Sequence, residues 1–490
     1  MGTIPLIIFV TIIITIIIGL IAGRKIKNKR ENFYVAGRNL SWLMVGFALM
    51  AQAIDGNATL GGVSLGFDFG FWAAAALPIG LALSLFLLGK FFAEKLNSMK
   101  LMTLGDFFSI KYNRKIEIIT SLLMLLSFGI LLAGNVAAVA ILTMNFMPLH
   151  YETTVILICL IILAYSLFGG IIADIWSDMW QMLILAIGMI LTLIFIFTNF
   201  DFTNFLNSTI FNDGLNLNQL FTISNGGLIN LATIVALGFG NILAIDFNTR
   251  IFSAKSAISA KKGCYFGGIL TLIIGLPFAL LPIIFKYLNI SIVEGSPVLL
   301  TFANNILPSF IGGILISGII SASLSTIDGA MLSMGNIVTQ NLLRVQDHLD
   351  NTNNQESEKT FLYFSRFSLI PIACISMIFA MLLPSPGILL TVSFDIMFAS
   401  LLAPFVFGFY LKKPSSFAAF YAILTGFIVR LLFGILSPSS FGIENNIFYL
   451  KNSFITADMD GIGTIIAPLF AFVVYYLIYI FSKKPDLKNL

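Results

Sequence analysis

Residues 48–66 read Ala-Leu-Met-Ala-Gln-Ala-Ile-Asp-Gly-Asn-Ala-Thr-Leu-Gly-Gly-Val-Ser-Leu-Gly. This segment stands where a membrane-crossing helix is expected, but it is too polar for an ordinary span and too apolar for a loop. Asp55 lies near its middle, and a carboxylate at mid-bilayer costs about 2.5–3.5 kcal/mol unless it faces protein, water or an ion. Gly56, Gly61 and Gly62 each weaken a helix by up to about 1 kcal/mol relative to Ala. We therefore expect the helix to open here and to offer main-chain carbonyls to an ion and a substrate.

The composition is that of a polytopic α-helical membrane protein. Of the 490 residues, 58% are hydrophobic and 10% are charged, and the mean hydropathy is +0.98. The net charge of +4 does not indicate nucleic-acid binding, because the basic residues lie at the ends of apolar blocks. The three cysteines have no metal-binding or redox spacing and are interpreted as small buried hydrophobes. No cofactor motif or catalytic constellation is present, so we do not expect an enzyme.

The apolar blocks predict thirteen spans. The first block has no basic segment before it and several Lys and Arg residues after it, which is typical of a retained span with its N-terminus outside. Basic residues then recur at alternate span ends, so we expect the C-terminus inside, in a multi-pass protein of the cytoplasmic (plasma) membrane. The predicted spans are roughly 4–22, 42–67, 71–92, 116–146, 153–170, 173–198, 227–247, 264–288, 309–341, 362–384, 387–411, 416–435 and 463–482.

The seventh span has a polar interruption like that of the second. It contains Leu237-Gly-Phe-Gly-Asn-Ile-Leu-Ala-Ile-Asp246, and the two interrupted spans are five spans apart. This arrangement indicates two five-helix halves of opposite orientation, an inverted repeat. The predicted organisation is an extra N-terminal span and loop (1–40), a first repeat (41–198), an external loop (199–226), a second repeat (227–411), and two final spans with a short tail (412–490).

The ninth span carries a run of hydroxyl residues. It reads Ser317-Gly-Ile-Ile-Ser-Ala-Ser-Leu-Ser-Thr-Ile-Asp-Gly-Ala-Met-Leu-Ser333. The hydroxyls of Ser325 and Thr326, the carbonyl of Ala322 and an opened second span would together form an oxygen cage that suits sodium, a hard cation. The alternative is that small and hydroxyl residues only let the helices pack closely and hydrogen-bond to each other.

The same run resembles the signature of the sodium/solute symporter family, which includes sodium-coupled sugar, proline, pantothenate, sialic acid and choline transporters. Three further segments resemble family motifs in the same order: Phe33-Tyr-Val-Ala-Gly-Arg-Asn-Leu-Ser-Trp, Tyr165-Ser-Leu-Phe-Gly-Gly-Ile-Ile-Ala-Asp-Ile-Trp-Ser-Asp-Met-Trp-Gln and Arg250-Ile-Phe-Ser-Ala-Lys. The resemblance covers roughly residues 30–430. It implies the leucine-transporter type of inverted-repeat fold and sodium as the coupling ion.

The resemblance also assigns residues to the ion. The family's sodium site maps onto main-chain oxygens of Ala51, Ile54 and Ala322 and onto the side chains of Ser325 and Thr326. Its aspartate on the sodium exit path maps to Asp178. The alternative for Asp178 is an interfacial carboxylate that pairs with a nearby Lys or Arg.

The solute is less well defined by the sequence. Asp55 occupies a position where sugar and proline transporters carry Ser, and no arginine is placed to bind a carboxylate. Residues 71–93 resemble the choline-transporter branch, although the tryptophans of a full choline cage are missing. We therefore expect a small ammonium-bearing solute, such as a choline-like compound, an amine or an amino acid. The predicted substrate contacts are Gln52, Asp55, Asn57, Phe71, Trp72, Asn135, Asn241 and Asp395.

Alternative roles remain open for several buried charges. Asp246 precedes Arg250 by four residues, so an i,i+4 pair explains it as well as a site does. Arg430 lies outside the repeats and is expected to reach the interface or pair with a neighbour. The predicted function is sodium-coupled import of a small organic solute by alternating access. A proton-coupled symporter of the same fold and a non-transporting membrane sensor are the alternatives, and the oligomeric state is left open.

Overall fold

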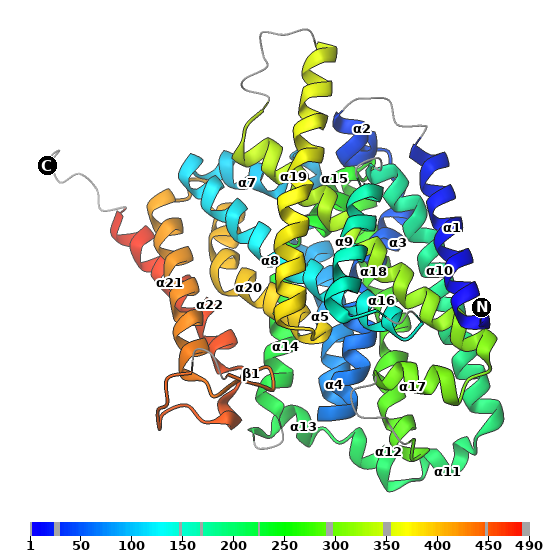
Figure 1. The fold of residues 1–490 in the computed structure, drawn as a ribbon. Helices are drawn as coiled ribbons and strands as arrows, with labels where there is room; N and C mark the ends of the chain where they lie inside the picture. The colour runs from blue at the N-terminus through cyan, green and yellow to red at the C-terminus, as the bar shows by residue number, and fades with distance from the viewer. Residues whose placement is uncertain are drawn as a thin grey trace, which may run out of the picture.

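The protein is a bundle of long helices, described here by a computed structural model (Figure 1). The structure describes residues 2–23, 30–146, 149–166, 170–223, 226–290, 297–345, 354–445 and 449–482. The helices are α1 (Thr3–Gly23), α2 (Arg30–Val35), α3 (Trp42–Ala53), α4 (Gly62–Phe69), α5 (Phe71–Leu87), α6 (Ala93–Ser98), α7 (Leu104–Lys111), α8 (Arg114–Met144), α9 (Tyr151–Ser166), α10 (Ile171–Asn199), α11 (Phe202–Leu206), α12 (Thr209–Gly214), α13 (Asn218–Phe221), α14 (Gly227–Gly240), α15 (Ile245–Ser253), α16 (Ala257–Tyr287), α17 (Val298–Asn305), α18 (Ser309–Ile337), α19 (Asn354–Leu382), α20 (Pro386–Tyr410), α21 (Ser416–Leu436) and α22 (Ile462–Ser482).

Short 3₁₀ or π-helical turns extend or join several of these helices. They are η1 (Ala36–Arg38), η2 (Asn57–Gly61), η3 (Leu88–Phe92), η5 (Asn241–Leu243), η6 (Val338–Leu342) and η7 (Ala457–Met459). The strands of the described residues, β1 (Ser439–Ser440) and β2 (Ile443–Glu444), form one antiparallel hairpin between α21 and α22.

Apolar helices occupy the positions of all the predicted spans. Among the described residues, nine helices are long and apolar enough to cross a membrane, or eleven if each of two bent pairs counts as one span. Shorter apolar helices, Thr3–Gly19 and Tyr151–Leu163, lie at the first and fifth predicted spans. The multi-pass architecture is therefore confirmed, whereas the count of thirteen complete crossings stays a prediction.

Two of the spans are broken where the sequence predicts it. The segment Trp42–Ala53 and the segment Asn57–Phe69 are bent by 50° at their junction, and Gly227–Leu243 is bent by 46° against Ile245–Ser253. In the first break, a Cβ on Gly56 would overlap the side chain of Ser323, so glycine lets α3 and α18 approach closely here. Ala244 interrupts the second helix with a non-helical ψ of 120°.

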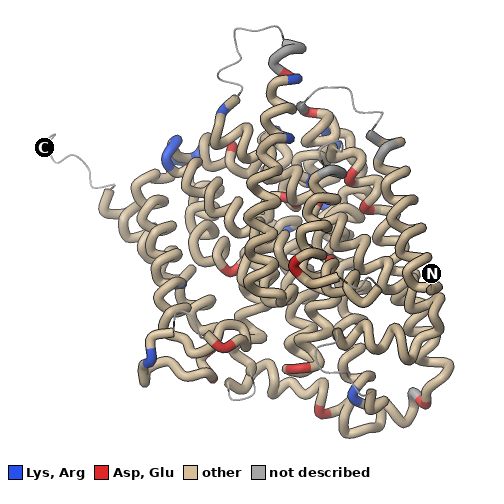
Figure 2. The backbone as a smooth tube through the Cα atoms, in the orientation of Figure 1, with Lys and Arg blue, Asp and Glu red and all other residues tan. Residues whose placement is uncertain are grey.

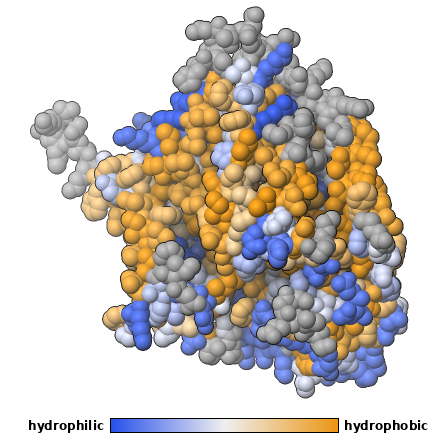
Figure 3. All heavy atoms as spheres, in the orientation of Figure 1, coloured by the Kyte–Doolittle hydropathy of each residue, from blue (hydrophilic) through white to orange (hydrophobic). Residues whose placement is uncertain are grey.

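Charged and apolar side chains are separated along the bundle. Lys and Arg gather at the end that carries α2, α7 and the α20–α21 loop, which we call the basic end (Figure 2). Hydrophobic side chains cover the flank between the two ends (Figure 3). This asymmetry is the basis of the predicted orientation, which itself stays a prediction. Residues 24–29 and 483–490, which carry part of the predicted basic charge, lie outside the described residues.

The halves of the broken helices nearest the basic end are joined to each other. The amide of Leu40, just before α3, donates to the Ser253 oxygen at 3.1 Å, and the amide of Lys255 donates to the Leu40 oxygen at 2.9 Å. The Asn97 side chain donates to the oxygens of Ile251 and Ala254 at 2.8 and 2.9 Å. The Leu40 bonds join the start of α3 to the end of α15, and Asn97 connects the same end of α15 to α6.

The prediction that all three cysteines are buried was wrong for one of them. All three are free thiols, and Cys159 and Cys264 are buried, but Cys374 on α19 is exposed. In a membrane protein an apolar side chain faces lipid as readily as it faces the protein interior, because lipid tails are as apolar as leucine.

Candidate ion and substrate site

The first break is organised by the carboxylate of Asp55. Its Oδ1 accepts the amide of Ala58 at 2.9 Å, and its main-chain oxygen accepts the hydroxyl of Thr59 at 2.6 Å. A carboxylate at this position satisfies amides at the start of the second half-helix, as an N-cap residue does. Because the Ala58 amide donates to the Asp55 carboxylate, it does not donate to the Ile54 carbonyl four residues earlier.

The helix α18 brings hydroxyl groups to this break. The Thr326 hydroxyl lies 3.3 Å from the Ala51 oxygen, and Ala51, Ile54, Ala322, Ser325 and Thr326 are all buried. The five predicted ligands therefore come from two adjoining elements, α3 with its break and α18. Neutral main-chain and hydroxyl oxygens are suitable ligands for a hard alkali cation, and the residues present fit a sodium ion.

The predicted exit-path residue contacts this candidate sodium site directly. The Ser325 hydroxyl donates to Oδ1 of Asp178 on α10. Asp178 is fully buried, and its Oδ2 lies 3.6 Å from the guanidinium of Arg250. Asp178 thus has a buried arginine as its partner rather than an interfacial Lys or Arg.

Arg250 on α15 is the centre of a network that sequence reasoning missed. Its buried guanidinium forms an ion pair with Asp174, one turn before Asp178 on α10. In the amide orientation that satisfies both neighbours, Gln52 donates to Asp246 Oδ2 at 3.3 Å and accepts from Arg250 at 2.9 Å. We call Arg250, Asp174, Asp178, Asp246 and Gln52 the Arg250 network.

The expected pairing of Asp246 with Arg250 differs in the structure. The guanidinium reaches the main-chain oxygen of Asp246 at 3.4 Å, while its ion pairs go to Asp174 and Asp178. Two carboxylates on a neighbouring helix compete better than the one on its own helix. The i,i+4 spacing of Asp174 and Asp178 on an apolar helix was the available sequence signal.

Asp55 is held by amides and not by a basic side chain. The Asn135 Nδ2 donates to its Oδ2 at 2.6 Å, and the Asn57 Nδ2 donates to the same oxygen at 3.1 Å. The Asn135 Oδ1 in turn accepts the Gly56 amide at 3.2 Å. In the described part of the chain no Lys, Arg or His lies within ion-pair distance of this carboxylate, which is 1% exposed.

The structure brings only part of the predicted substrate set together. Asp55, Asn57 and Asn135 meet at the first break, whereas the Gln52 side chain contacts Arg250 and Asp246. Asn241 is buried in η5, where its Nδ2 donates to the Leu237 oxygen at 3.0 Å.

Phe71 and Trp72 do not join this group. They follow the whole half-helix Asn57–Phe69, which at 1.5 Å per residue is itself about 20 Å long. The Trp72 indole donates to the Asn216 oxygen of the α12–α13 loop at 3.1 Å, so it packs at the surface.

Asp395 pairs with an arginine and does not join the polar residues around Asp55. On α20, it forms an ion pair with Arg430 on α21, outside the two predicted repeats. Of the alternatives considered for Arg430, pairing with a neighbour is the one observed.

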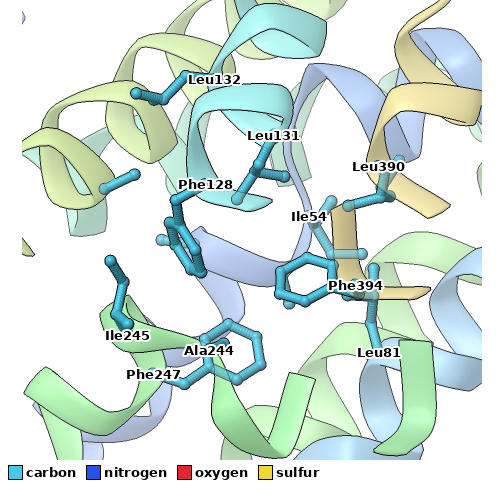
Figure 4. Packing of buried hydrophobic residues seen from close by; sticks show 14 of the residues in the cluster. Ile54, Leu81, Phe128, Leu131, Leu132, Ala244, Ile245, Phe247, Leu390 and Phe394 are labelled. Atoms are coloured by element: carbon cyan, nitrogen blue, oxygen red, sulfur yellow. The ribbon is translucent and has the colours of Figure 1, made fainter. Parts of the chain in front are cut away.

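Aromatic side chains that the sequence analysis did not select lie between the two breaks. Phe128 on α8 and Phe394 on α20 have ring centroids 5.9 Å apart, and both are buried (Figure 4). Ile54 and Phe247, from the two broken spans, lie in the same cluster. Phenylalanine is abundant in this chain, with 48 residues, so no local pattern distinguished these two.

A cavity of about 670 Å³ lies on the side of the site away from the basic end. Its lining includes Gly61, Ser64 and Asp68 of the first broken span, together with Gly387 at the start of α20. A Cβ on Gly61 would overlap the main chain of Gly387, so these two helices touch directly. Asn57 lies one turn before Gly61, and neither Asn57 nor Asp55 lines the cavity.

Broken helices that meet a hydroxyl-rich helix midway along a bundle define a class of protein, the secondary transporters with inverted repeats. Residues 33–426 match the Sodium:solute symporter family, and the chain belongs to this family. It is therefore a sodium-coupled transporter and not an enzyme.

Curated relatives differ in the solute they are named for. The chain is 26% identical to a sodium/glucose cotransporter of Vibrio parahaemolyticus over 54% of this chain and 52% of that protein, so it matches about half of that relative's length. It is 22% identical to a high-affinity choline transporter of Drosophila melanogaster, over 88% of this chain and 70% of that protein. A sodium/pantothenate symporter of Haemophilus influenzae is also 22% identical, over 86% and 88% of the two chains.

The fold has a solved counterpart. A Na⁺-coupled sialic acid symporter in a substrate-bound, outward-open state aligns with a TM-score of 0.77 and 17% identity, over 97% of this chain and 98% of that chain. The predicted inverted-repeat fold is confirmed by this likeness, and Na⁺ is the coupling ion of the family.

Proposed function

We propose that this symporter imports a small solute that carries an ammonium group. The observation that carries the proposal is the Asp55 carboxylate, which is buried and has amide partners but, among the described residues, no basic side chain within ion-pair distance. A buried carboxylate without a cation is costly, so a cation must accompany it or it must take up a proton. A substrate ammonium supplies that cation when it binds.

The surroundings of Asp55 support the same solute class. The Phe128 and Phe394 rings lie in the adjoining cluster, and aromatic faces attract ammonium groups. The buried Arg250 and the partly buried Arg430 are both already paired with aspartates, so neither is available for a substrate carboxylate. We propose Gln52, Asn57, Asn135 and Asn241 as the further polar contacts of the solute.

We propose that sodium couples to transport by joining the two halves of the site. Ala51 and Ile54 at the first break, with Ala322, Ser325 and Thr326 on α18, hold the ion. Sodium that leaves this site meets Asp178, which also faces Arg250. Release of sodium and loosening of the Arg250 network are therefore linked, and the unit formed by α3 and α15 opens towards the basic end.

The energetics suffice for accumulation of the solute. Moving one charge through 100 mV supplies about 2.3 kcal/mol, and a tenfold sodium gradient adds about 1.4 kcal/mol. Together they support a solute gradient of roughly several hundredfold for each sodium. We propose that residues 41–198 and 227–411 are the two repeats that move, in the plasma membrane, with the N-terminus outside and the C-terminus inside.

The test is a thermal-shift screen of purified protein followed by uptake into proteoliposomes. Choline, other amines, neutral amino acids, sugars and organic acids are each tested with sodium and with potassium in its place. We expect a sodium-dependent shift with ammonium-bearing compounds. A shift only with sugars or acids overturns the substrate class, and uptake driven by a proton gradient without sodium identifies a proton-coupled symporter. Binding without uptake identifies a sensor.

A further inference from the structure

A second cavity lies on the flank of the bundle, away from the candidate ion and substrate site. It is an apolar groove of about 480 Å³ between α5, α14, α20 and α22. Its lining is apolar except for the hydroxyl of Tyr410 and includes Phe91, Phe239, Leu402 and Leu469. Phe91, Tyr410 and Leu469 are 45%, 58% and 58% exposed, so the groove is open towards the bilayer and not sealed inside the protein.

Lysines gather where this groove reaches the basic end. Lys90 lies in η3 next to Phe91, and Lys412 and Lys413 follow the end of α20. The Tyr410 hydroxyl donates to the Phe91 oxygen at 3.4 Å, which holds these two elements together. All three lysines are exposed, and in the described residues none has an acidic side chain within ion-pair distance.

The two neighbouring charged side chains, Glu94 and Lys95, already have partners within the protein. Glu94 pairs with Lys261 at 3.3 Å, and Lys95 donates to the Phe409 oxygen at 2.8 Å. The end of the groove therefore presents uncompensated positive charge at the level where α5 and α20 end. Basic residues at such a place between spans recognise anionic headgroups, while the apolar channel accepts a hydrocarbon chain.

We propose that this groove is a binding site for an anionic phospholipid. One acyl chain lies along the groove between α5 and α20, and the headgroup phosphate contacts Lys90 on one side and Lys412 or Lys413 on the other. The Tyr410 hydroxyl lies at the junction of chain and headgroup, the depth at which tyrosine is enriched in membrane proteins.

The position of this lipid connects it to transport. One wall is formed by α14, which is part of the second broken span, and by α5, which follows the first broken span in the chain. The other wall, α20 and α22, carries Phe398 and Phe472. The stacked rings of Phe239 and Phe398, with centroids 5.8 Å apart, span the two sides. An acyl chain between these walls changes how far they separate when the broken spans move.

The test is native mass spectrometry of the full-length protein released from nanodiscs with equal amounts of phosphatidylglycerol and phosphatidylcholine. We expect phosphatidylglycerol to be retained preferentially. Lys90→Gln and Lys412→Gln are each expected to lower its occupancy about fivefold, the effect of one lysine near an anionic surface. Leu469→Trp, which fills the groove from its exposed side, is expected to displace both lipids.

The matched control is Lys451→Gln, an exposed lysine at the opposite end of the bundle, which should leave lipid retention unchanged. Equal retention of the two lipids, or phosphatidylglycerol binding that survives both lysine substitutions and Leu469→Trp, overturns the proposal. A protein dimer that buries the groove in place of lipid also overturns it. In proteoliposomes, uptake should rise with phosphatidylglycerol content in the wild type and not in the Lys90→Gln/Lys412→Gln variant.

Discussion

The Thr326 hydroxyl lies 3.3 Å from the main-chain oxygen of Ala51, although the two residues are 275 positions apart in the sequence. This contact joins α18 to the first broken span at the point where the helix loses its regular hydrogen bonding. The candidate sodium site depends on it, because neither element alone supplies enough oxygens to replace the hydration shell of an ion.

Removal of the Thr326 hydroxyl should weaken sodium binding. Thr326→Val keeps the volume but removes one ligand, and we expect the half-saturating sodium concentration for uptake to rise about 10- to 100-fold. The control is Thr192→Val, since the buried Thr192 hydroxyl donates to the Gly188 oxygen of its own helix and, among the described residues, to no other helix. An unchanged sodium requirement in Thr326→Val would exclude this hydroxyl as a ligand.

Neutralisation of Asp55 should separate solute binding from ion binding. Asp55→Asn keeps the shape of the side chain but removes its charge, so uptake of an ammonium-bearing solute should fall by at least tenfold. Sodium affinity, measured by sodium-dependent thermal shift, should change much less. Asn135→Asp is the companion variant, and a second carboxylate beside Asp55 should alter the pH dependence of uptake. Normal uptake by Asp55→Asn would remove Asp55 from the substrate site.

Disruption of the Arg250 network should open the protein towards the basic end. In Asp174→Asn the buried Arg250 loses the shorter of its two ion pairs and keeps only the 3.6 Å contact with Asp178, and breaking a buried pair costs about 3–5 kcal/mol. We expect a lower midpoint of thermal unfolding and faster labelling of a cysteine placed at Ser333. The double variant Asp174→Asn/Arg250→Gln should recover part of the stability. Additive losses in the double variant would show that the two residues do not act as a pair.

Replacement of the Asp395–Arg430 pair should distinguish a structural role from a substrate role. Asp395→Asn alone leaves the partly buried Arg430 beside a neutral partner and should destabilise the protein. In Asp395→Leu/Arg430→Met both charges are gone, so stability and uptake should return towards the wild type. If the double variant regains stability but not uptake, Asp395 has a second role: it contacts the solute in addition to pairing with Arg430.

Local patterns in the chain predicted the fold to a large extent. The lengths of the apolar blocks located the helices, and glycines beside Asp55 and near Asp246 located the two breaks. The run of hydroxyls on the ninth span predicted Ala322, Ser325 and Thr326 as candidate sodium ligands, whereas Ala51 and Ile54 were assigned through the resemblance to the family. Phe71 and Trp72 were selected because residues 71–93 resemble the choline-transporter branch, and that resemblance did not show that an intact half-helix separates them from Asp55.

The amino-acid sequence by itself determined that this is a multi-span helical membrane protein with two interrupted spans, since hydrophobic length and glycine content act within one segment. Only the tertiary structure decided which charges meet: Arg250 pairs with Asp174 and not with Asp246, and Arg430 pairs with Asp395. The physical reason is that a buried charge takes the best partner within a few ångströms, and that partner comes from helices whose packing no single segment encodes.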